Sequence, residues 1–148
     1  IMLNYTKFFV IVLFFFNFSS GLNAQNFNQK LQEIRKEINR DDVKKALKLL
    51  GEVKVINDIQ QEKIDLLFGD IYLKINQIDK AEEFYQKTFF TSNEEIEAKT
   101  FIGLAEVRLA QGKLNDAIKY AEQSIQINSS KIRPKIILAI AKIQNRKR

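Results

Sequence analysis

One pattern is written twice in this chain, as LLFGDIYLKINQIDKAEEFYQKTF at residues 66–89 and as GLAEVRLAQGKLNDAIKYAEQSI at residues 103–125. Sliding one copy over the other pairs Gly69 with Ala105, and this offset of 36 residues recurs along both copies. A period of this size is typical of helical-repeat arrays, in which each unit buries its apolar face only by stacking on the next unit. The two copies therefore predict an all-α fold built from antiparallel helix pairs.

In the first copy, apolar residues recur at spacings of three and four between residues 64 and 75, which is one stripe of an α-helix. Asn76 and Gln77 interrupt the stripe, and Asp79 is expected to cap a second helix. Gly69 and Ala81 are small residues on facing sides, so we expect the two helix backbones to approach closely. The expected inner residues are Ile64, Leu67, Phe68, Ile71, Tyr72 and Ile75 in the first helix, and Ala81, Phe84, Tyr85, Thr88 and Phe89 in the second.

The second copy repeats this arrangement with its own residues. A turn is expected at residues 111–113, and Asn115 or Asp116 is expected to cap the helix that follows. Between the two copies, Phe90 is expected to be more exposed than Phe89 and to pack against the loop of residues 91–95; a contact with a partner is the alternative. The expected inner residues are Phe101, Leu104, Ala105, Val107 and Leu109, then Ala117, Ile118, Ala121, Ser124, Ile125 and Ile127.

The two copies resemble the tetratricopeptide repeat family. The resemblance lies in a small residue, a bulky residue three positions later and a second small residue nine positions after that. Arg108 departs from the family, which usually has Tyr at that position. The resemblance implies a right-handed superhelical array, an α-solenoid of about three repeats, that binds proteins and is not an enzyme. The matching residues are Gly69, Tyr72 and Ala81 in the first copy, and Ala105, Arg108 and Ala117 in the second.

These patterns divide the chain into five segments. Residues 1–24 are a signal peptide, and residues 25–61 are a degenerate first helix pair. Residues 62–97 and 98–131 are the two clear repeats, and residues 132–148 form a last helix. The helical stripes of the degenerate pair are Phe27, Leu31, Ile34 and Ile38, then Val43, Ala46, Leu47, Leu50 and Val53.

The N-terminal segment has the pattern of a secretory signal peptide. Lys7 precedes an apolar run at residues 8–18, and a stretch of small and polar residues ends at Ala24. The run is too short to span a bilayer, which needs about twenty apolar residues. We expect export and cleavage after Ala24, which leaves a periplasmic or secreted protein without a stable membrane span; an uncleaved anchor is the alternative.

The composition excludes several classes of function. The chain has no Cys and no His, so the usual transition-metal ligands and the bases of catalytic triads are missing, and we expect no metal and no cofactor. The net charge of +6 is spread along the chain rather than gathered with stacking aromatic residues, so nucleic acid is not an expected partner. The expected partner is a protein or a peptide.

The last segment, residues 132–148, is apolar around most of a helix for about two turns. Pro134 suits the first turn of this helix. A helix that ends an array should be polar on its outer side, so a further helix is expected to cover this one. Two interpretations remain open. The segment is the first helix of an incomplete repeat in a longer protein, or it is a capping helix whose exposed side is tolerated or paired in a dimer.

The concave groove of the array is expected to be lined by first-helix side chains that do not pack inward. Asp70 and Glu106 hold central positions and would repel a peptide's C-terminal carboxylate, so a peptide with apolar anchors and a basic residue fits better. Their helices lie about 10 Å apart, but nothing in the sequence indicates a raised pKa, so no catalytic role is expected. The expected groove residues are Lys63, Leu66, Asp70, Leu73, Lys74, Lys99, Ile102, Glu106, Leu109, Arg133, Ile136 and Ile140.

Three functions are compatible with these patterns. The leading hypothesis is an exported, non-enzymatic scaffold that binds a protein segment in the groove of its repeats. The second is the N-terminal repeat region of a longer sensor, such as a histidine kinase, or of an envelope enzyme whose catalytic domain lies beyond residue 148. The third is a small structural protein that self-associates through the helix of residues 132–148.

Overall fold

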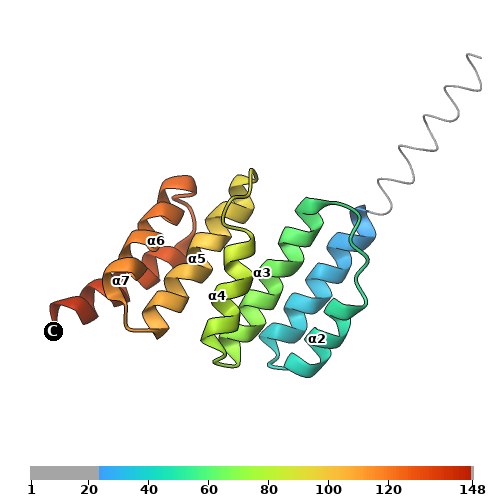
Figure 1. Cartoon of the computed structure of the whole chain (residues 1–148), viewed down its shortest axis with the longest axis horizontal. Helices are drawn as coiled ribbons and strands as arrows, with labels where there is room; N and C mark the ends of the chain where they lie inside the picture. The colour runs from blue at the N-terminus through green and yellow to red at the C-terminus, as the bar shows by residue number, and fades with distance from the viewer. Residues whose placement is uncertain (1–23, 148) are drawn as a thin grey trace, which may run out of the picture. The chain divides into compact units, whose positions relative to one another are not determined.

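The computed structural model describes residues 24–147 (Figure 1). Every regular element in this range is an α-helix, with seven helices and no strand, as the repeat pattern predicts for a helical-repeat array. The chain divides into two compact units, one ending at Lys54 and the other beginning at Val55. None of the helices in this range is both long and apolar enough to cross a membrane. The expected signal peptide lies outside the described residues except for Ala24 itself.

The first unit contains a helix at residues 24–39 and α2 (Val43–Gly51). Asp42 caps α2, because its side chain accepts a hydrogen bond from the Lys45 backbone N–H at 3.0 Å. Glu37 is only 4% exposed and accepts a hydrogen bond from the Lys45 side chain at 3.1 Å, which ties the two helices together. The buried apolar residues of this unit are Phe27, Leu31, Ile34, Ala46 and Leu50.

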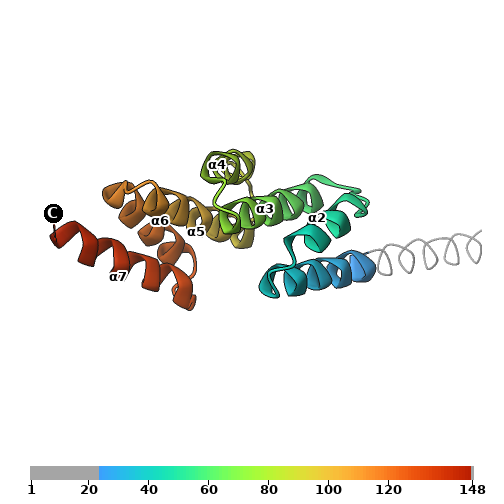
Figure 2. The same cartoon turned by 90° about the horizontal axis from the view of Figure 1, so that it is seen from below.

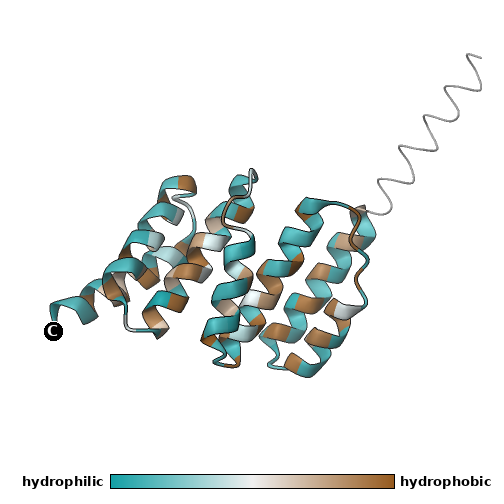
Figure 3. Cartoon of the chain, in the orientation of Figure 1, coloured by the Kyte–Doolittle hydropathy of each residue, from teal (hydrophilic) through white to brown (hydrophobic). Residues whose placement is uncertain are grey.

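The second unit contains five helices, whose apolar residues recur between polar ones along each helix (Figure 3). In order they are α3 (Asp58–Lys74), α4 (Ile78–Lys87), α5 (Glu94–Ala110), α6 (Leu114–Ile127) and α7 (Ile132–Arg146).

These five helices pack as two sets, one made of α3, α5 and α7 and the other of α4 and α6. Helix α5 contacts both α3 and α7, so α3, α5 and α7 form one row. Helix α4 packs against α3 and α5, and α6 packs against α5 and α7 (Figures 1 and 2). The sides of α3, α5 and α7 that are turned away from α4 and α6 are called the open face below. This arrangement is the stacked helix-pair packing that the repeat pattern predicts.

The turns between paired helices each contain a residue in the left-handed backbone conformation, at equivalent positions of the two repeats. Asn76 has φ 60° and Gly112 has φ 70°, and they lie 36 residues apart, just after α3 and α5. Glycine and asparagine tolerate this conformation better than other residues, which explains why these two types occur there. The predicted interruptions at residues 76–77 and 111–113 are therefore confirmed.

The predicted caps of α4 and α6 are wrong. Both helices begin with an apolar residue, Ile78 in α4 and Leu114 in α6, and the residue before each makes no side-chain capping bond. Ile78 packs against the core and Leu114 is only 4% exposed. Because these side chains are covered, both helices begin earlier in the sequence than predicted. Asp79 and Asp116 instead lie in the first turn, where a negative charge is favourable.

Candidate functional site

The centre of the open face is built around Tyr85, a residue of α4 whose ring lies between α3 and α5. Tyr85 is 1% exposed, and its ring lies against Gly69 of α3 and Gly103 of α5. A Cβ atom built at Gly69 would lie 2.6 Å from the ring, and one at Gly103 would lie nearer still. Gly69 therefore makes room for the Tyr85 ring, rather than only for the facing Ala81 as the sequence suggested.

The hydroxyl of Tyr85 reaches a carboxylate on the open face. It donates a hydrogen bond to Asp70 Oδ1 at 2.7 Å. Burial of the phenol, reinforced by the negative charges of Asp70 and Glu106, raises the pKa of Tyr85 far above its ordinary value. The phenol is therefore protonated in the folded protein and acts as a fixed hydrogen-bond donor that orients Asp70.

Glu106 of α5 lies next to this bond and pairs with Arg133 of α7. Arg133 of α7 donates from Nε to Glu106 Oε1 at 2.7 Å and from Nη2 to Oε2 at 2.6 Å. This two-bond contact raises the pKa of Arg133, and Asp70 adds to the effect through its charge. Asp70, Tyr85, Glu106 and Arg133, named the Tyr85 cluster here, thus join α3, α4, α5 and α7.

A second part of the open face lies where α5 begins. Lys99 pairs with Glu95 one turn before it, and this hydrogen bond, followed by the Lys99 charge and then the more distant charges of Lys63 and Lys131, lowers the pKa of Glu95. A pocket of about 190 Å³ opens beside this pair. It is lined by Glu94, Glu95, Ala98, Lys99, Ile102, Ile127, Asn128 and Lys131.

The twelve predicted groove residues fall into three groups. Four apolar ones are covered within the unit, and Leu66 is a core residue at 5% exposure rather than a lining residue. Leu73 packs against the same core as Leu66, and Ile102 and Leu109 pack against the cluster that contains Ile137 of α7. Helix neighbours in the row cover these side chains, which repeat spacing alone does not reveal.

The charged members are engaged within the protein. Asp70, Lys99, Glu106 and Arg133 make the contacts described above, Lys63 is half-buried, and Lys74 is exposed to solvent although it also interacts with the chain. Ile136 and Ile140 form the third group, because both are exposed, at 53% and 39%. The open face therefore offers fixed polar groups over α3 and α5 and free apolar surface over α7.

The Tyr85 cluster has the geometry of a structural site. Two hydrogen bonds from Arg133 hold Glu106, and the Tyr85 hydroxyl holds Asp70, so each carboxylate is engaged by another side chain of the protein. Among residues 24–147 no group of three or more acidic side chains is arranged to hold a metal ion.

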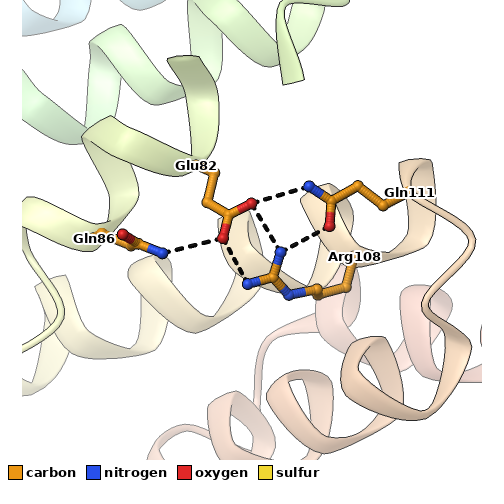
Figure 4. A network of polar contacts seen from close by, with 4 residues as sticks. All are labelled: Glu82, Gln86, Arg108 and Gln111. Atoms are coloured by element: carbon orange, nitrogen blue, oxygen red, sulfur yellow. Dashed lines mark hydrogen bonds and ion pairs between the residues drawn. The ribbon is translucent and has the colours of Figure 1, made fainter. Parts of the chain in front are cut away.

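Arg108, the departure from the family pattern, has a structural role on α5. Its guanidinium donates to both carboxylate oxygens of Glu82 in α4, at 2.8 and 2.6 Å, and to Gln111 at 2.7 Å (Figure 4). Gln111 and Gln86 donate to the same carboxylate. Arg108 and Glu82 are 14% and 18% exposed, so this network clamps α4 to α5 in a partly desolvated place.

Phe90 does not pack as the sequence suggests. It is 95% exposed, and its ring makes a T-shaped contact with the ring of Phe89 at a centroid distance of 5.0 Å. The expected packing on residues 91–95 fails because α5 already begins at Glu94, which leaves a loop too short to fold over the ring.

The sequence does not predict the roles of several residues of the site. Tyr85 is identified as a core residue, but its hydroxyl contact with Asp70 is not predicted. Glu95 and Lys131 line the pocket although neither belongs to the expected groove set. A usable signal exists in the spacing of Gly69 and Gly103, because two helical glycines flanking one tyrosine indicate space for its ring.

The comparison with known families agrees with this geometry. Residues 66–87 match the model of a family described as tetratricopeptide repeat. The matched range begins in the middle of α3 and ends with α4, so it covers the second half of one helix and the whole of its partner. No curated protein and no solved structure matches the chain. The match supports the tetratricopeptide repeat family for this helix pair, and repeats of this type serve as protein-interaction modules.

Proposed function

We propose that this protein is a scaffold that holds a segment of a partner protein on its open face. The observation that carries the proposal is the Tyr85 cluster, which fixes polar groups from four helices at one place on a row that continues a matched interaction repeat. Rigid side chains lose little conformational freedom when a partner binds, so such a surface favours recognition. The bound segment is extended or helical and contributes apolar anchors.

The two ends of the open face favour different chemistry in that segment. Lys99 and Lys131 line the pocket where α5 begins together with Glu94 and Glu95, and Lys63 is close enough to affect Glu95, so charges of both signs gather at this end. Ile136 and Ile140 on α7 offer apolar contacts at the other end. Asp70 and Glu106 already have partners, so a basic residue in the segment is less important than the sequence suggests.

Photocrosslinking tests the scaffold function in cells that make the protein. A photoreactive phenylalanine analogue replaces Lys99 on the open face, and in a matched variant it replaces Lys119, an exposed lysine on α6. A discrete crosslinked partner at position 99 that is absent at position 119 is the expected result. The synthetic segment identified in this way should bind the purified chain and lose affinity with Lys99→Glu but not with Lys119→Glu. Equal crosslinking at both positions, or none, contradicts the proposal.

We also propose that the scaffold is exported, on the strength of the signal-peptide pattern at residues 1–24. Residues 1–30 fused to a mature alkaline phosphatase, an enzyme that is active only after export, should give phosphatase activity in a bacterial host. Leu13→Asp with Phe15→Asp breaks the apolar run and should abolish it. Amino-terminal sequencing of the exported fusion should begin at Gln25. Activity that survives the double substitution counts against export by this segment.

A further inference from the structure

Helix α7 carries an apolar stripe that nothing in the second unit covers. Ile132, Ile136, Ile140 and Ile143 recur at spacings of three and four, which places them along one side of the helix. They are 71%, 53%, 39% and 55% exposed. The buried residues of α7 are Pro134, Ile137 and Ala141, and they lie on the opposite side, where α5 and α6 pack.

The internal repetition indicates what kind of structure covers such a stripe. Leu66 on α3 and Ile102 on α5 precede Ile136 at offsets of 36 and then 34 residues. Leu66 packs in a core with residues of α5, and Ile102 packs against the cluster that contains Ile137 of α7. On each earlier helix of the row, the side chain at this position is therefore covered by the next helix of the row. By the same geometry, the α7 stripe is shaped for a helix.

The charge of α7 indicates the chemistry of that helix. Residues 123–148 contain no Asp or Glu, and Lys135 and Arg146 are exposed beside the stripe. Where cations of α7 contact the rest of the unit, they meet acidic partners: Arg133 pairs with Glu106. Lys142 pairs with Glu122 in the same way. Two copies of α7 laid against each other would bring only like charges together, which disfavours that pairing.

We propose that the α7 stripe binds an acidic amphipathic helix of a partner protein. Apolar side chains of the partner helix pack on Ile136, Ile140 and Ile143, and acidic side chains at its edge pair with Lys135 and Arg146. This inference rests on the proposed scaffold function and deepens it, because it names the class of segment that the α7 end of the open face takes.

Two fluorescent synthetic peptides test the inference with the full chain. Both carry the same leucine stripe at helical spacing, and they differ only in their edge residues, which are Glu in one and Lys in the other. The Glu peptide should bind, measured by fluorescence anisotropy, and more weakly as salt is added. The Lys peptide should bind at least about tenfold more weakly, because its charges meet those of α7.

Variants locate the binding. Ile136→Ser with Ile143→Ser should weaken binding of the Glu peptide at least about tenfold, and Lys135→Glu with Arg146→Glu should remove its preference over the Lys peptide. Ile59→Ser is the matched control, because Ile59 is also exposed, at 47%, but lies on α3. All of these side chains are at the surface, so circular dichroism should show unchanged helix content.

Other results overturn the inference. They are equal binding of the two peptides, no binding of the Glu peptide, or an equal loss in Ile59→Ser. A dimer in sedimentation velocity that the Ile136→Ser, Ile143→Ser variant dissociates would assign the stripe to a second copy. If the gene encodes a longer chain and that chain does not bind the Glu peptide, the stripe would be assigned to a further helix of the same protein. Crosslinking at position 99 without peptide binding removes only this inference and leaves the scaffold function.

Discussion

Tyr85 shows how two glycines and one aromatic residue define the centre of the array. Gly69 and Gly103 come from different repeats, and both lack the Cβ atom that would occupy the ring's place. The ring cannot move aside easily, because it is fully buried and its hydroxyl is bonded to Asp70. At the scale of single residues, the packing of two repeats on each other therefore depends on these glycines.

We predict that Gly103→Ala destabilises the protein. Alanine is the better helix former by about 1 kcal/mol, but its methyl group would overlap a buried ring, and overpacking of this kind costs about 1–3 kcal/mol. The net result should be a lower free energy of unfolding in urea. Tyr85→Leu, combined with Gly103→Ala, should recover part of this loss, because the smaller side chain leaves room for the methyl group.

Gly51→Ala is the control for this prediction. A Cβ atom at Gly51 has no neighbour within 4 Å, and the residue closes helix α2. It should leave the free energy of unfolding unchanged or raise it slightly. A Gly103→Ala protein as stable as Gly51→Ala would show that the Tyr85 ring does not fill the space between the two repeats as described.

The sequence predicts which residues are small but not what they face. Gly69 and Ala81 are both at inner positions, and Ala81 is fully buried, as expected. The role of Gly103 depends on a ring from the preceding repeat, and the spacing within one helix pair carries no information about that contact. The Tyr85–Asp70 bond is missed for the same reason.

At the scale of helices, the contact between α4 and α5 depends on a salt bridge between Glu82 and Arg108. The hydrogen bond from Arg108 is the main reason that the pKa of Glu82 lies below its ordinary value of 4.5. A carboxyl group whose pKa is lower in the folded state stabilises the protein at pH values above 4.5. That contribution is lost as the pH falls through the lowered pKa.

Glu82→Gln should therefore destabilise the protein near neutral pH. The change removes the charge while it keeps the shape, and hydrogen bonds to charged groups contribute about 1.5–3 kcal/mol, so a loss of about 1–2 kcal/mol is expected. The difference from the unsubstituted protein should shrink as the pH is lowered from 4.5 through the folded pKa. Urea unfolding at neutral and acidic pH measures both effects.

The neighbouring Glu83 supplies a matched control. It pairs with Lys87 at 3.4 Å on the surface of α4, where their side chains are 65% and 43% exposed. Exposed pairs at this spacing contribute about 0.3–0.5 kcal/mol, so Glu83→Gln should change stability little at neutral pH. Equal losses in the two variants would mean that the Glu82 network does not clamp α4 to α5.

The helices themselves are largely predictable, and their contacts are less so. Apolar spacing locates both clear helix pairs, and the left-handed residues Asn76 and Gly112 lie where the turns are expected. Cap positions fail at α4 and α6, because burial of Ile78 and Leu114 decides where those helices start. Arg108 can be recognised from sequence as unusual, but its partner Glu82 lies in the preceding repeat.

At the scale of the whole molecule, the division at residues 54 and 55 has a consequence for folding. The second unit contains five helices and two hydrophobic clusters of its own. In repeat proteins, stability is approximately a sum over units and their neighbour contacts. A chain of residues 55–148 should therefore be helical and unfold cooperatively, as measured by circular dichroism during a thermal scan. A helix signal without a cooperative transition would contradict the independence of this unit.

The candidate site is predicted less completely than the fold. Repeat spacing places Asp70, Glu106 and Arg133 in one set, which the structure does bring together. Leu66, Leu73, Ile102 and Leu109 belong to the same set by spacing, yet neighbouring helices bury or partly cover them. Such cover depends on the distance between helices, which depends in turn on glycines and ring sizes in adjacent repeats.

Binding on the open face is the central claim, and amide NMR tests it most directly. The isotope-labelled chain is titrated with the partner segment that crosslinking at position 99 identifies. The largest shifts should come from the open-face residues of α3, α5 and α7, including Lys63, Lys99 and Ile136. Shifts gathered on α4 and α6, with those three amides unmoved, would contradict the claim.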